Sequence, residues 1–446
     1  MSNIDVTSVL LNEQDGRIPS VNFITLGCAK NEVDSADMQR RLVSAGFAIV
    51  DDAEDADVVI VNTCSFIQAA IEESIDVILE VAGLDNIADG SSKLIVAGCM
   101  PARFGDDLES ELNEASAFVP CSKEDDIVEV VQRTLGVNPA PFARVDVESG
   151  PAAAYVKISD GCNRFCSFCS IPYIRGRYHS FPYERIRASV EQCIAEGSVE
   201  ITLIGQDTGC WGSDFEEKST TAQLLSNLAE EFPDTWFRIM YVEPDGITDE
   251  LLDAIAGHDN VCDYLDMPLQ HANPELLKSM RRKGSAPEFL KLLERIRTRV
   301  PGITLRTTLI TGFPGETEEA FDELMEFLEE ADFDYVGVFP YSREEGTRAY
   351  DLPDQVEEEL KVARAQEVRD LCDAVGSVHT ADRIGKELDV LVLGAEEDGQ
   401  LFGRAMCQAP DVDGVVYVDG GEVGEIVRVT IVDTLAYDME GEIIHG

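Results

Sequence analysis

The sequence predicts an α/β protein with an N-terminal α/β parallel-sheet domain, a β/α barrel and a small C-terminal all-β barrel. Between residues 21 and 339, short apolar runs alternate with amphipathic helical stretches, which is typical of parallel sheets with crossover helices. After residue 386, short strand patterns follow one another with Gly and Asp turns between them. The length of 446 residues suits about three domains of roughly 150 residues each.

The N-terminal domain is predicted over residues 20–137. Apolar runs indicate strands at residues 21–26, 57–62 and 93–97. A helical spacing of apolar residues indicates helices at 31–45, 66–81 and 125–135. Residues 138–151 hold three prolines and are predicted to link this domain to the next.

The second domain is predicted over residues 152–382. Its strands are expected at residues 155–159, 200–204, 236–241, 261–267, 304–310 and 335–339. Its helices are expected at residues 183–196, 221–231, 248–256, 287–300 and 318–330. Six βα units in one region predict a closed or partial β/α (TIM-type) barrel. A long charged helix at 355–379 is expected to leave this barrel.

The third domain is predicted over residues 384–446. Short strands are expected at residues 388–393, 401–406, 415–418 and 426–432, which suits a small β-barrel. From Lys386 to the end the sequence holds 14 acidic and 3 basic residues, so this region has a net charge of −11.

The whole chain is strongly acidic, because 35 Lys and Arg stand against 86 Asp and Glu, a formal charge of −51. Binding to a phosphate backbone depends on basic patches, so this charge disfavours a nucleic-acid substrate and favours a basic protein partner. An alternative of equal weight is that the proteins of the host are acidic in general.

The N-terminal segment indicates the compartment. Residues 1–17 lack the basic start and apolar core of a signal peptide, and no apolar run approaches the ~20 residues that span a bilayer. We therefore expect a cytoplasmic protein without a membrane partner, whose twelve cysteines stay reduced or bind metal.

The strongest chemical signal is the spacing C-x3-C-x2-C of Cys162, Cys166 and Cys169, directly after the first barrel strand. Three thiolates on one short loop suit three irons of a cubane iron–sulfur cluster. Since no fourth cysteine is nearby, one iron would stay open, as catalytic metal sites require. The alternative is a structural zinc knuckle, which needs a fourth ligand in register; His179 lies ten residues past Cys169.

Three further cysteines, Cys28, Cys64 and Cys99, each follow a predicted strand of the N-terminal domain by one to two residues. The carboxyl ends of parallel strands share one edge, where ligands bind, so we expect these thiols to converge. Each cysteine alone is more typical of a buried core thiol. The repeated placement predicts a second three-cysteine cluster with an open iron.

The C-x3-C-x2-C motif, with aromatic Phe168 just before the third cysteine, resembles the radical S-adenosylmethionine (SAM) superfamily. With the second cysteine trio, the chain from residue 21 onward resembles the methylthiotransferase family of that superfamily. The resemblance implies a radical SAM barrel, a C-terminal TRAM barrel, and a SAM-cleaving 4Fe–4S cluster on the catalytic Cys162, Cys166 and Cys169. It also implies an auxiliary 4Fe–4S cluster on the other three cysteines. Two SAM molecules would act per turnover, one supplying a methyl group and the other a radical, with an electron donor and a sulfur donor as partners.

Two stretches resemble the branch of this family that modifies an aspartate in the twelfth protein of the small ribosomal subunit, a basic protein. Residues 27–35 carry Ala-Lys after the cysteine, and residues 264–273 end in His-Ala-Asn. The branch that modifies a tRNA adenosine tends to carry Gln-Met and Ser-Gly-Ser there. An acidic TRAM barrel agrees with the first branch, because it would repel tRNA and attract a basic protein. The tRNA reaction, a non-catalytic iron–sulfur electron carrier and a zinc-stabilised RNA-binding protein remain the alternatives.

Four barrel residues are candidates for cofactor binding: Phe168, Gln206, Arg306 and Thr308. Gln206 follows the second barrel strand, and barrel sites gather at strand carboxyl ends. Arg306 and Thr308 lie on the fifth strand, and an arginine fork suits the carboxylate of SAM. For Gln206 the alternative is an ordinary helix-capping turn, and for Arg306 it is a structural ion pair.

Two other features are less distinct. Cys121 ends the apolar stretch 117–120 and stands out among the remaining cysteines. The basic run 281–283 is more typical of an ion-paired surface face than of a nucleic-acid contact in so acidic a chain.

Overall fold

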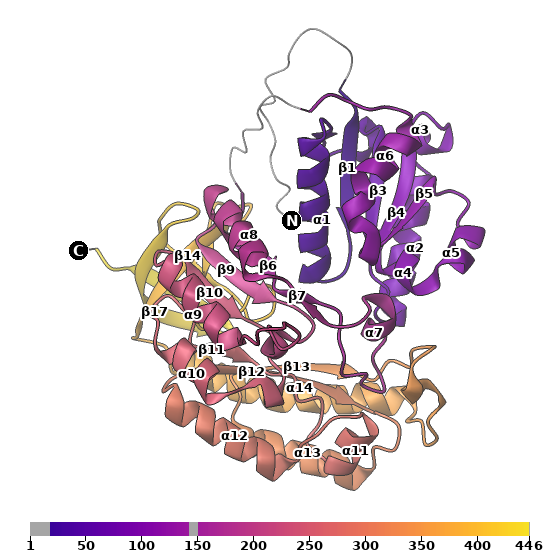
Figure 1. Ribbon diagram of the computed structural model, residues 1–446. Coiled ribbons are helices and arrows are strands. Elements are labelled where there is room, and N and C mark those ends of the chain that lie inside the picture. Colours follow the sequence, from indigo (N-terminus) through magenta and orange to yellow (C-terminus); the bar gives the residue numbers. More distant parts are fainter. Residues whose placement is uncertain (1–17, 142–149, 446) are drawn as a thin grey trace. The chain divides into compact units, whose positions relative to one another are not determined.

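The structure is a computed structural model that describes residues 18–141 and 150–445 (Figure 1). The chain divides into two compact units, described separately below. Among the described residues, the N-terminal unit holds residues 18–141 and Gly150 together with Asp160–Asn163 and Cys169–Tyr178. The C-terminal unit holds Pro151–Ser159, Arg164–Phe168 and residues 179–445. Most of the predicted linker 138–151 lies outside the described residues.

The N-terminal unit is built on a five-stranded parallel sheet of order β2-β1-β3-β4-β5. Its strands are β1 (Ser20–Thr25), β2 (Ala48–Ile49), β3 (Val58–Thr63), β4 (Lys93–Gly98) and β5 (Ala117–Pro120). The three predicted strands are confirmed, and the prediction lacked the two edge strands β2 and β5. Both are short, and only one of their six residues is fully buried, so neither forms a long apolar run.

Helices cover both faces of this sheet (Figure 1). The helices of this unit are α1 (Ala29–Ser44), α2 (Gln68–Ala82), α3 (Asp85–Ala88), α4 (Cys99–Phe104), α5 (Asp106–Glu111), α6 (Ile127–Leu135) and α7 (Ile171–Ile174), with the 3-10 turns η1 (Ala53–Asp55) and η2 (Cys121–Asp126). Val58 and Ile60 of β3 pack with side chains of α1 and α6, whereas Val59 and Val61 pack with α2. A strand buried on both faces explains why β3 is a continuous apolar run.

The C-terminal unit begins with a partial β/α barrel made of two three-stranded parallel sheets. The first has the order β10-β9-β6, from β6 (Ala153–Lys157), β9 (Glu200–Ile204) and β10 (Trp236–Ile239). The second is β11 (Tyr264–Asp266), β12 (Thr304–Thr311) and β13 (Tyr335–Pro340). A single bridge from Phe237 to Val261 joins the two sheets. Within the described residues β6 and β13 are not paired, so the barrel is partial.

The barrel helices are α8 (Tyr183–Ala195), α9 (Thr221–Glu231), α10 (Asp249–Ala256), α11 (Pro274–Ser279), α12 (Ala286–Arg299) and α13 (Glu318–Ala331), followed by α14 (Glu358–Ala381). Short elements between them are β7 (Ser159–Asp160), β8 (His179–Ser180), η3 (Thr208–Cys210), η4 (Pro244–Gly246) and η5 (Arg348–Asp351). Leu305 and Leu309 of β12 are buried in the hydrophobic core of the barrel, so Arg306 and Thr308, which alternate with them, point to the opposite face. In the part of the chain that the structure describes, no helix is long and apolar enough to span a bilayer.

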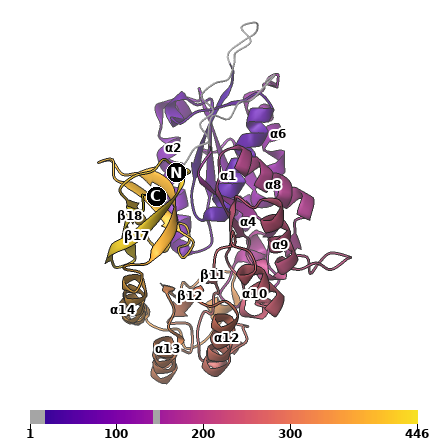
Figure 2. The same cartoon turned by 90° about the vertical axis from the view of Figure 1, so that its left-hand side faces the viewer.

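The C-terminal barrel is closed and five-stranded, with the order β14-β15-β16-β18-β17 (Figure 2, yellow). Its strands are β14 (Glu387–Ala395), β15 (Leu401–Ala405), β16 (Val416–Val418), β17 (Ile426–Leu435) and β18 (Asp438–Ile443). The predicted four strands were therefore one too few. Strand β18 alternates three acidic residues with Met439, Gly441 and Ile443, a period of two that could have revealed it.

A buried ion cluster joins the C-terminal barrel to the base of the β/α barrel. Fully buried Glu200, at the start of β9, accepts hydrogen bonds from Arg238 Nε (2.8 Å) and Arg404 Nη2 (2.7 Å). Burial alone would raise the pKa of Glu200, but the two guanidinium groups hold it below its usual range. The carboxylate therefore stays ionised between strands of both barrels.

Candidate functional site

The first candidate site lies at the carboxyl edge of the N-terminal sheet. Cys28 follows β1, Cys64 follows β3 directly, and Cys99 follows β4 directly. In a sheet of this strand order, β1 and β3 flank the point where the strand order reverses, and ligands bind there at the strand carboxyl ends. The topology thus puts the three thiols at one edge, as the sequence predicted.

The side chain of Asn31 marks the centre of this edge. Its Oδ1 atom lies 4.0 Å from Cys28 Sγ and 3.9 Å from Cys99 Sγ. Its amide Nδ2 donates to the carbonyls of Leu26 (2.8 Å) and Thr63 (3.0 Å), which fixes the side chain between β1 and β3. Two of the three thiols therefore meet at one atom.

The third thiol is held against the backbone of Gly27. This glycine has φ = +98°, and a Cβ added to it would lie 2.7 Å from Cys64 Cβ and 3.0 Å from Cys64 Sγ. A side chain at this position would therefore be strained and would push Cys64 away. Gly27 places the loop of Cys28 and the end of β3 in close contact.

A buried arginine completes the edge. Arg175 lies at the C-cap of α7, and its Nη2 donates to Asn31 Oδ1 (2.9 Å) and Asp34 Oδ2 (2.8 Å). The same nitrogen lies 3.9 Å from Cys99 Sγ, and Nη1 lies 3.4 Å from Asp160 Oδ2. Burial raises the pKa of the Cys64 and Cys99 thiols, and the charge of Arg175 works in the opposite direction.

Cys121 follows β5 at the same edge of the sheet. Its thiol donates to the carbonyl of Ile174 (3.4 Å), and burial raises its pKa to about 12. A thiol that donates to a backbone carbonyl already has a partner, which suits a structural role.

The second candidate site is the loop that carries Cys162, Cys166 and Cys169, which lie within eight residues of one another. Gly161 has φ = +71°, and a Cβ there would lie 2.3 Å from the Arg177 carbonyl oxygen. The N–H of Cys162 donates to the Gly176 carbonyl (3.2 Å), so residues 176–177 fix the start of the loop. Phe165 takes φ = +50°, which is rare for a side chain of this size and marks a sharp bend between the cysteines.

Cys166 also faces a buried arginine. Arg282 Nη1 lies 3.7 Å from Cys166 Sγ and 2.8 Å from Glu243 Oε1, and Nη2 bonds to the other oxygen of Glu243. Burial raises the pKa of the Cys166 thiol, and the Arg282 charge lowers it. Arg282 belongs to the basic run 281–283, which the sequence placed on the surface. It is ion-paired as expected, but only 7% of its side chain is exposed.

The structure places Gln206 and its neighbour Asp207 after the second barrel strand, with buried acceptor atoms that have no partner. Gln206 Oε1 and Asp207 Oδ1 make no hydrogen bond to any described residue. The other oxygen, Asp207 Oδ2, accepts from Arg164 Nε (2.6 Å). Two unsatisfied acceptors in one turn are costly unless a ligand donates to them, so these residues fit the ammonium group of a bound amino acid such as the methionine part of SAM.

The structure places Arg306 between two carboxylates. Its Nη1 bonds to Asp266 (2.9 Å) and Thr308 Oγ1 (3.3 Å), and its Nε lies 3.4 Å from Asp413 of the C-terminal barrel. Among the described residues Nη2 of Arg306 has no hydrogen-bond partner. The ion pair that the sequence left open is therefore present, and SAM contacts by Arg306 and Thr308 stay predictions. Phe168 packs against the barrel core, and its role toward SAM likewise stays a prediction.

Within residues 18–141 and 150–445, no three His, Cys, Asp or Glu side chains converge on a point that would hold one metal ion. A cubane cluster does not need such a point, because each cysteine binds a different iron. The thiols of the N-terminal edge and of the barrel loop have the soft donors that such clusters require.

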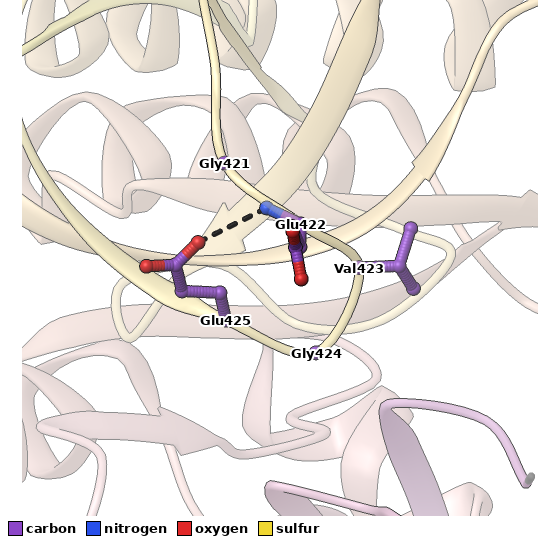
Figure 3. A pocket seen from close by; sticks show the side chains of 5 residues that line it. All are labelled: Gly421, Glu422, Val423, Gly424 and Glu425. Carbon is purple, nitrogen blue, oxygen red and sulfur yellow. Dashed lines mark hydrogen bonds between the residues drawn. The ribbon is translucent and has the colours of Figure 1, made fainter.

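A shallow pocket on the C-terminal barrel has a different character. Gly421, Glu422, Val423, Gly424 and Glu425 line it, and Glu422 N donates to Glu425 Oε2 (3.0 Å) (Figure 3). Its two side-chain charges are both negative. It therefore does not suit a phosphate or a nucleic-acid backbone.

Two candidate functional residues, Arg175 and Asn31, were not predicted from the sequence. Arg175 lies 141 residues from Asp34 along the chain, so no local pattern links them. Asn31 lies three residues after Cys28 and could have been noticed as a polar residue in the first turn of a helix.

The chain matches three known families in sequence. Residues 20–120 match the "Uncharacterized protein family UPF0004", residues 156–328 the "Radical SAM superfamily" and residues 384–444 the "TRAM domain". Among solved structures it is similar to the radical SAM methyltransferase TsrM from Kitasatospora setae, with a TM-score of 0.53 and 15% identity over 73% of this chain and 75% of that one. At that identity the similarity concerns the fold alone.

Two curated relatives are much closer. The proteins named "Ribosomal protein uS12 methylthiotransferase RimO" from Natranaerobius thermophilus and Geobacter sulfurreducens are each 42% identical to this chain. Each alignment covers 95% of this chain and 98% of the relative. The chain therefore belongs to the RimO family of ribosomal protein uS12 methylthiotransferases, within the radical SAM superfamily.

Proposed function

We propose that this enzyme adds a methylthio group to the β-carbon of an aspartate in ribosomal protein uS12, using two 4Fe–4S clusters and SAM. The substrate protein is the one named for relatives that are 42% identical over 95% of this chain. The motifs at residues 27–35 and 264–273 support the same branch of the family.

The observation that carries this proposal is the convergence of Cys28, Cys64 and Cys99 around Asn31 and Gly27. A C-x3-C-x2-C loop alone is shared by enzymes with many different reactions. A second cysteine trio on a separate sheet supports a reaction that must supply sulfur as well as a radical.

Each cysteine trio is assigned one group. Cys162, Cys166 and Cys169 would hold the SAM-cleaving cluster, and Cys28, Cys64 and Cys99 would hold the auxiliary cluster. When bound, these groups supply radical chemistry at an unactivated C–H bond and the sulfur that is transferred. Three of the six cysteines, Cys64, Cys99 and Cys162, are buried. The chain also contributes fixed loop geometry through Gly27 and Gly161, and one guanidinium beside each trio.

SAM is assigned to the polar residues of the barrel. Gln206 Oε1 and Asp207 Oδ1 would accept from its ammonium group, and Arg164 keeps the Asp207 carboxylate in place. Arg306 Nη2 and Thr308 Oγ1 are assigned to the carboxylate or the ribose of SAM. Both residues lie on the face of β12 that points away from the hydrophobic core. Phe168, just before Cys169, is assigned to an apolar contact with SAM.

The acidic surface supports a basic protein as the partner and argues against tRNA. The C-terminal barrel carries a net charge of −11 from Lys386 onward, and the exposed Glu422 and Glu425 lie together on it. The reaction also requires an electron donor and a sulfur donor. None of the twelve cysteines is in a disulfide bond, which supports the reducing cytoplasm as its location.

The test is an anaerobic assay of the cluster-reconstituted protein with SAM, a reductant and sulfide. Small ribosomal subunits and unmodified tRNA are supplied in parallel and analysed by mass spectrometry. We expect a methylthio mass gain on an aspartate of uS12 and none on tRNA. A gain on tRNA adenosine instead would overturn the substrate, and 5′-deoxyadenosine without any methylthio product would overturn the transfer reaction.

A charge-reversal pair tests the role of the acidic barrel separately. Replacing Glu422 and Glu425 by lysine should raise the KM for uS12 roughly threefold to tenfold at low salt, with kcat unchanged. The matched control replaces Glu216 and Glu217 by lysine; both are exposed on another loop of the same unit. An equal rise in KM in both variants would mean that only net charge matters and that the C-terminal barrel is not the docking surface.

A further inference from the structure

Arg175 is an unusual residue for the edge of a parallel sheet. Its side chain is 3% exposed, and it comes from the segment Cys169–Tyr178, which belongs to the N-terminal unit. Its pKa would be lowered by burial, but Asp34 and Asp160 raise it well above the usual value for arginine. The guanidinium is therefore a permanent positive charge in a poorly solvated site.

The guanidinium of Arg175 is close to the thiols through two contacts. Nη2 lies 3.9 Å from Cys99 Sγ, a distance at which an N–H can donate to sulfur. The same nitrogen bonds to Asn31 Oδ1 (2.9 Å), the atom beside both Cys28 Sγ and Cys99 Sγ. An ion pair with Asp34 alone would not require this position.

We propose that Arg175 is the positioning and electrostatic residue of the auxiliary site, and that it raises the reduction potential of a cluster held by Cys28, Cys64 and Cys99. This inference rests on the proposed function. A cation and an N–H donor beside a ligand sulfur stabilise the more negative, reduced form of an iron–sulfur cluster. Asp34 and Asp160 hold the guanidinium and partly offset its charge, so they set how large the effect is.

The proposed role suits the chemistry of transfer. When a carbon radical bonds to a sulfur at the thiolate level, one electron is left over, and a cluster held by Cys28, Cys64 and Cys99 would supply the acceptor for it. Arg175 would make that acceptance more favourable. The arginine thus serves the step that forms the carbon–sulfur bond, and not the cleavage of SAM.

The rival explanation is that Arg175 only ties its segment to the N-terminal sheet. The two explanations predict different directions for the effects of Arg175→Met and Asp34→Asn. If Arg175 acts by charge, Arg175→Met lowers the potential, whereas Asp34→Asn raises it because less of the positive charge is offset. If Arg175 is only structural, both variants weaken the same ion pair and change cluster loading in the same direction.

The experiment uses the full-length chain with C162A, C166A and C169A, so that the auxiliary cluster gives the only signal. Iron content, the EPR spectrum and an anaerobic redox titration are recorded for this parent and for added R175M, R175K and D34N. We expect R175M to lower the equilibrium constant for one-electron reduction about tenfold, equal to about 59 mV. R175K keeps the charge and should recover most of the shift, and D34N should move the potential upward.

A matched control is Arg364→Met in the same background. Arg364 is also buried and ion-paired, to Glu316 (2.9 Å), but none of its hydrogen bonds or ion pairs involves a cysteine. It should leave the potential unchanged. An unchanged potential in R175M, or shifts of the same sign in R175M and D34N, would overturn the inference while the parent still holds iron. A parent without iron would instead overturn the auxiliary cluster itself, and with it the proposed function.

Discussion

The two cysteine trios share one device and differ in how they are assembled. In each, a buried arginine lies beside one thiol: Arg175 is 3.9 Å from Cys99 Sγ, and Arg282 is 3.7 Å from Cys166 Sγ. Each arginine is held by a buried carboxylate, Asp34 or Glu243. The barrel cysteines, however, lie within eight residues on one loop, whereas the others follow three different strands. The compact trio depends on a loop, and the dispersed trio depends on the whole sheet.

The largest effect should separate the two trios by their products. Cys166→Ala should abolish 5′-deoxyadenosine formation, because it removes a proposed ligand of the SAM-cleaving cluster. Cys64→Ala should abolish methylthio transfer and leave SAM cleavage intact. Product analysis by mass spectrometry, with iron and sulfide content, checks both variants. A Cys64→Ala protein with full iron content and full transfer activity would contradict the second trio. Cys372→Ala, a buried cysteine on α14, is the control.

The next largest effect is on stability, and it should differ between Arg175 and Arg282. Arg175→Met leaves Asp34 and Asp160 without this partner and should cost about 3–5 kcal/mol of unfolding free energy. Arg282→Met should cost less, because Arg164 Nε also lies 4.0 Å from Glu243 and can compensate. Urea unfolding of both apoproteins measures the difference. Equal losses of unfolding free energy, or a larger loss for Arg282→Met, would show that Arg164 does not compensate for the missing Arg282.

The smallest effect concerns the ion pair of a third arginine, Arg306, because its carboxylate partner Asp413 changes protonation state within an accessible pH range. Burial raises the pKa of Asp413 to about 6, above that of an aspartate in the unfolded chain. Between about pH 4 and 6 the folded protein therefore holds a proton that the unfolded chain has released. The unfolding free energy should fall as pH rises through this window, by on the order of 2 kcal/mol. Asp413→Asn should remove this slope in urea titrations at several pH values, and an unchanged slope would assign it to other groups.

The same contrast explains what the sequence could predict. The barrel trio was visible directly, since its spacing is local. The dispersed trio required the inference that parallel strands end at a common edge, and that inference located Cys28, Cys64 and Cys99. Arg175 could not be found, because its partners Asn31 and Asp34 lie over 140 residues away in sequence. Long buried strands such as β3 were predicted because they are apolar on both faces. The short β2 was missed because it has only two residues, and β18 was missed because its acidic residues interrupt the apolar run that was used to recognise strands.

The ion cluster at Glu200 limits how the C-terminal barrel can be studied. Its Arg404 belongs to that barrel, whereas Glu200 and Arg238 belong to the barrel with the cysteine loop. Leu391 and Ala409 of the C-terminal barrel also share an apolar cluster with Trp236 and Tyr264. Deleting the C-terminal barrel would expose this cluster and remove half of the positive charge that keeps Glu200 ionised. A shortened protein would therefore lose solubility and folding, which would hide any separate effect on substrate binding. Surface charge substitutions are the cleaner way to test the proposed role of this barrel in binding.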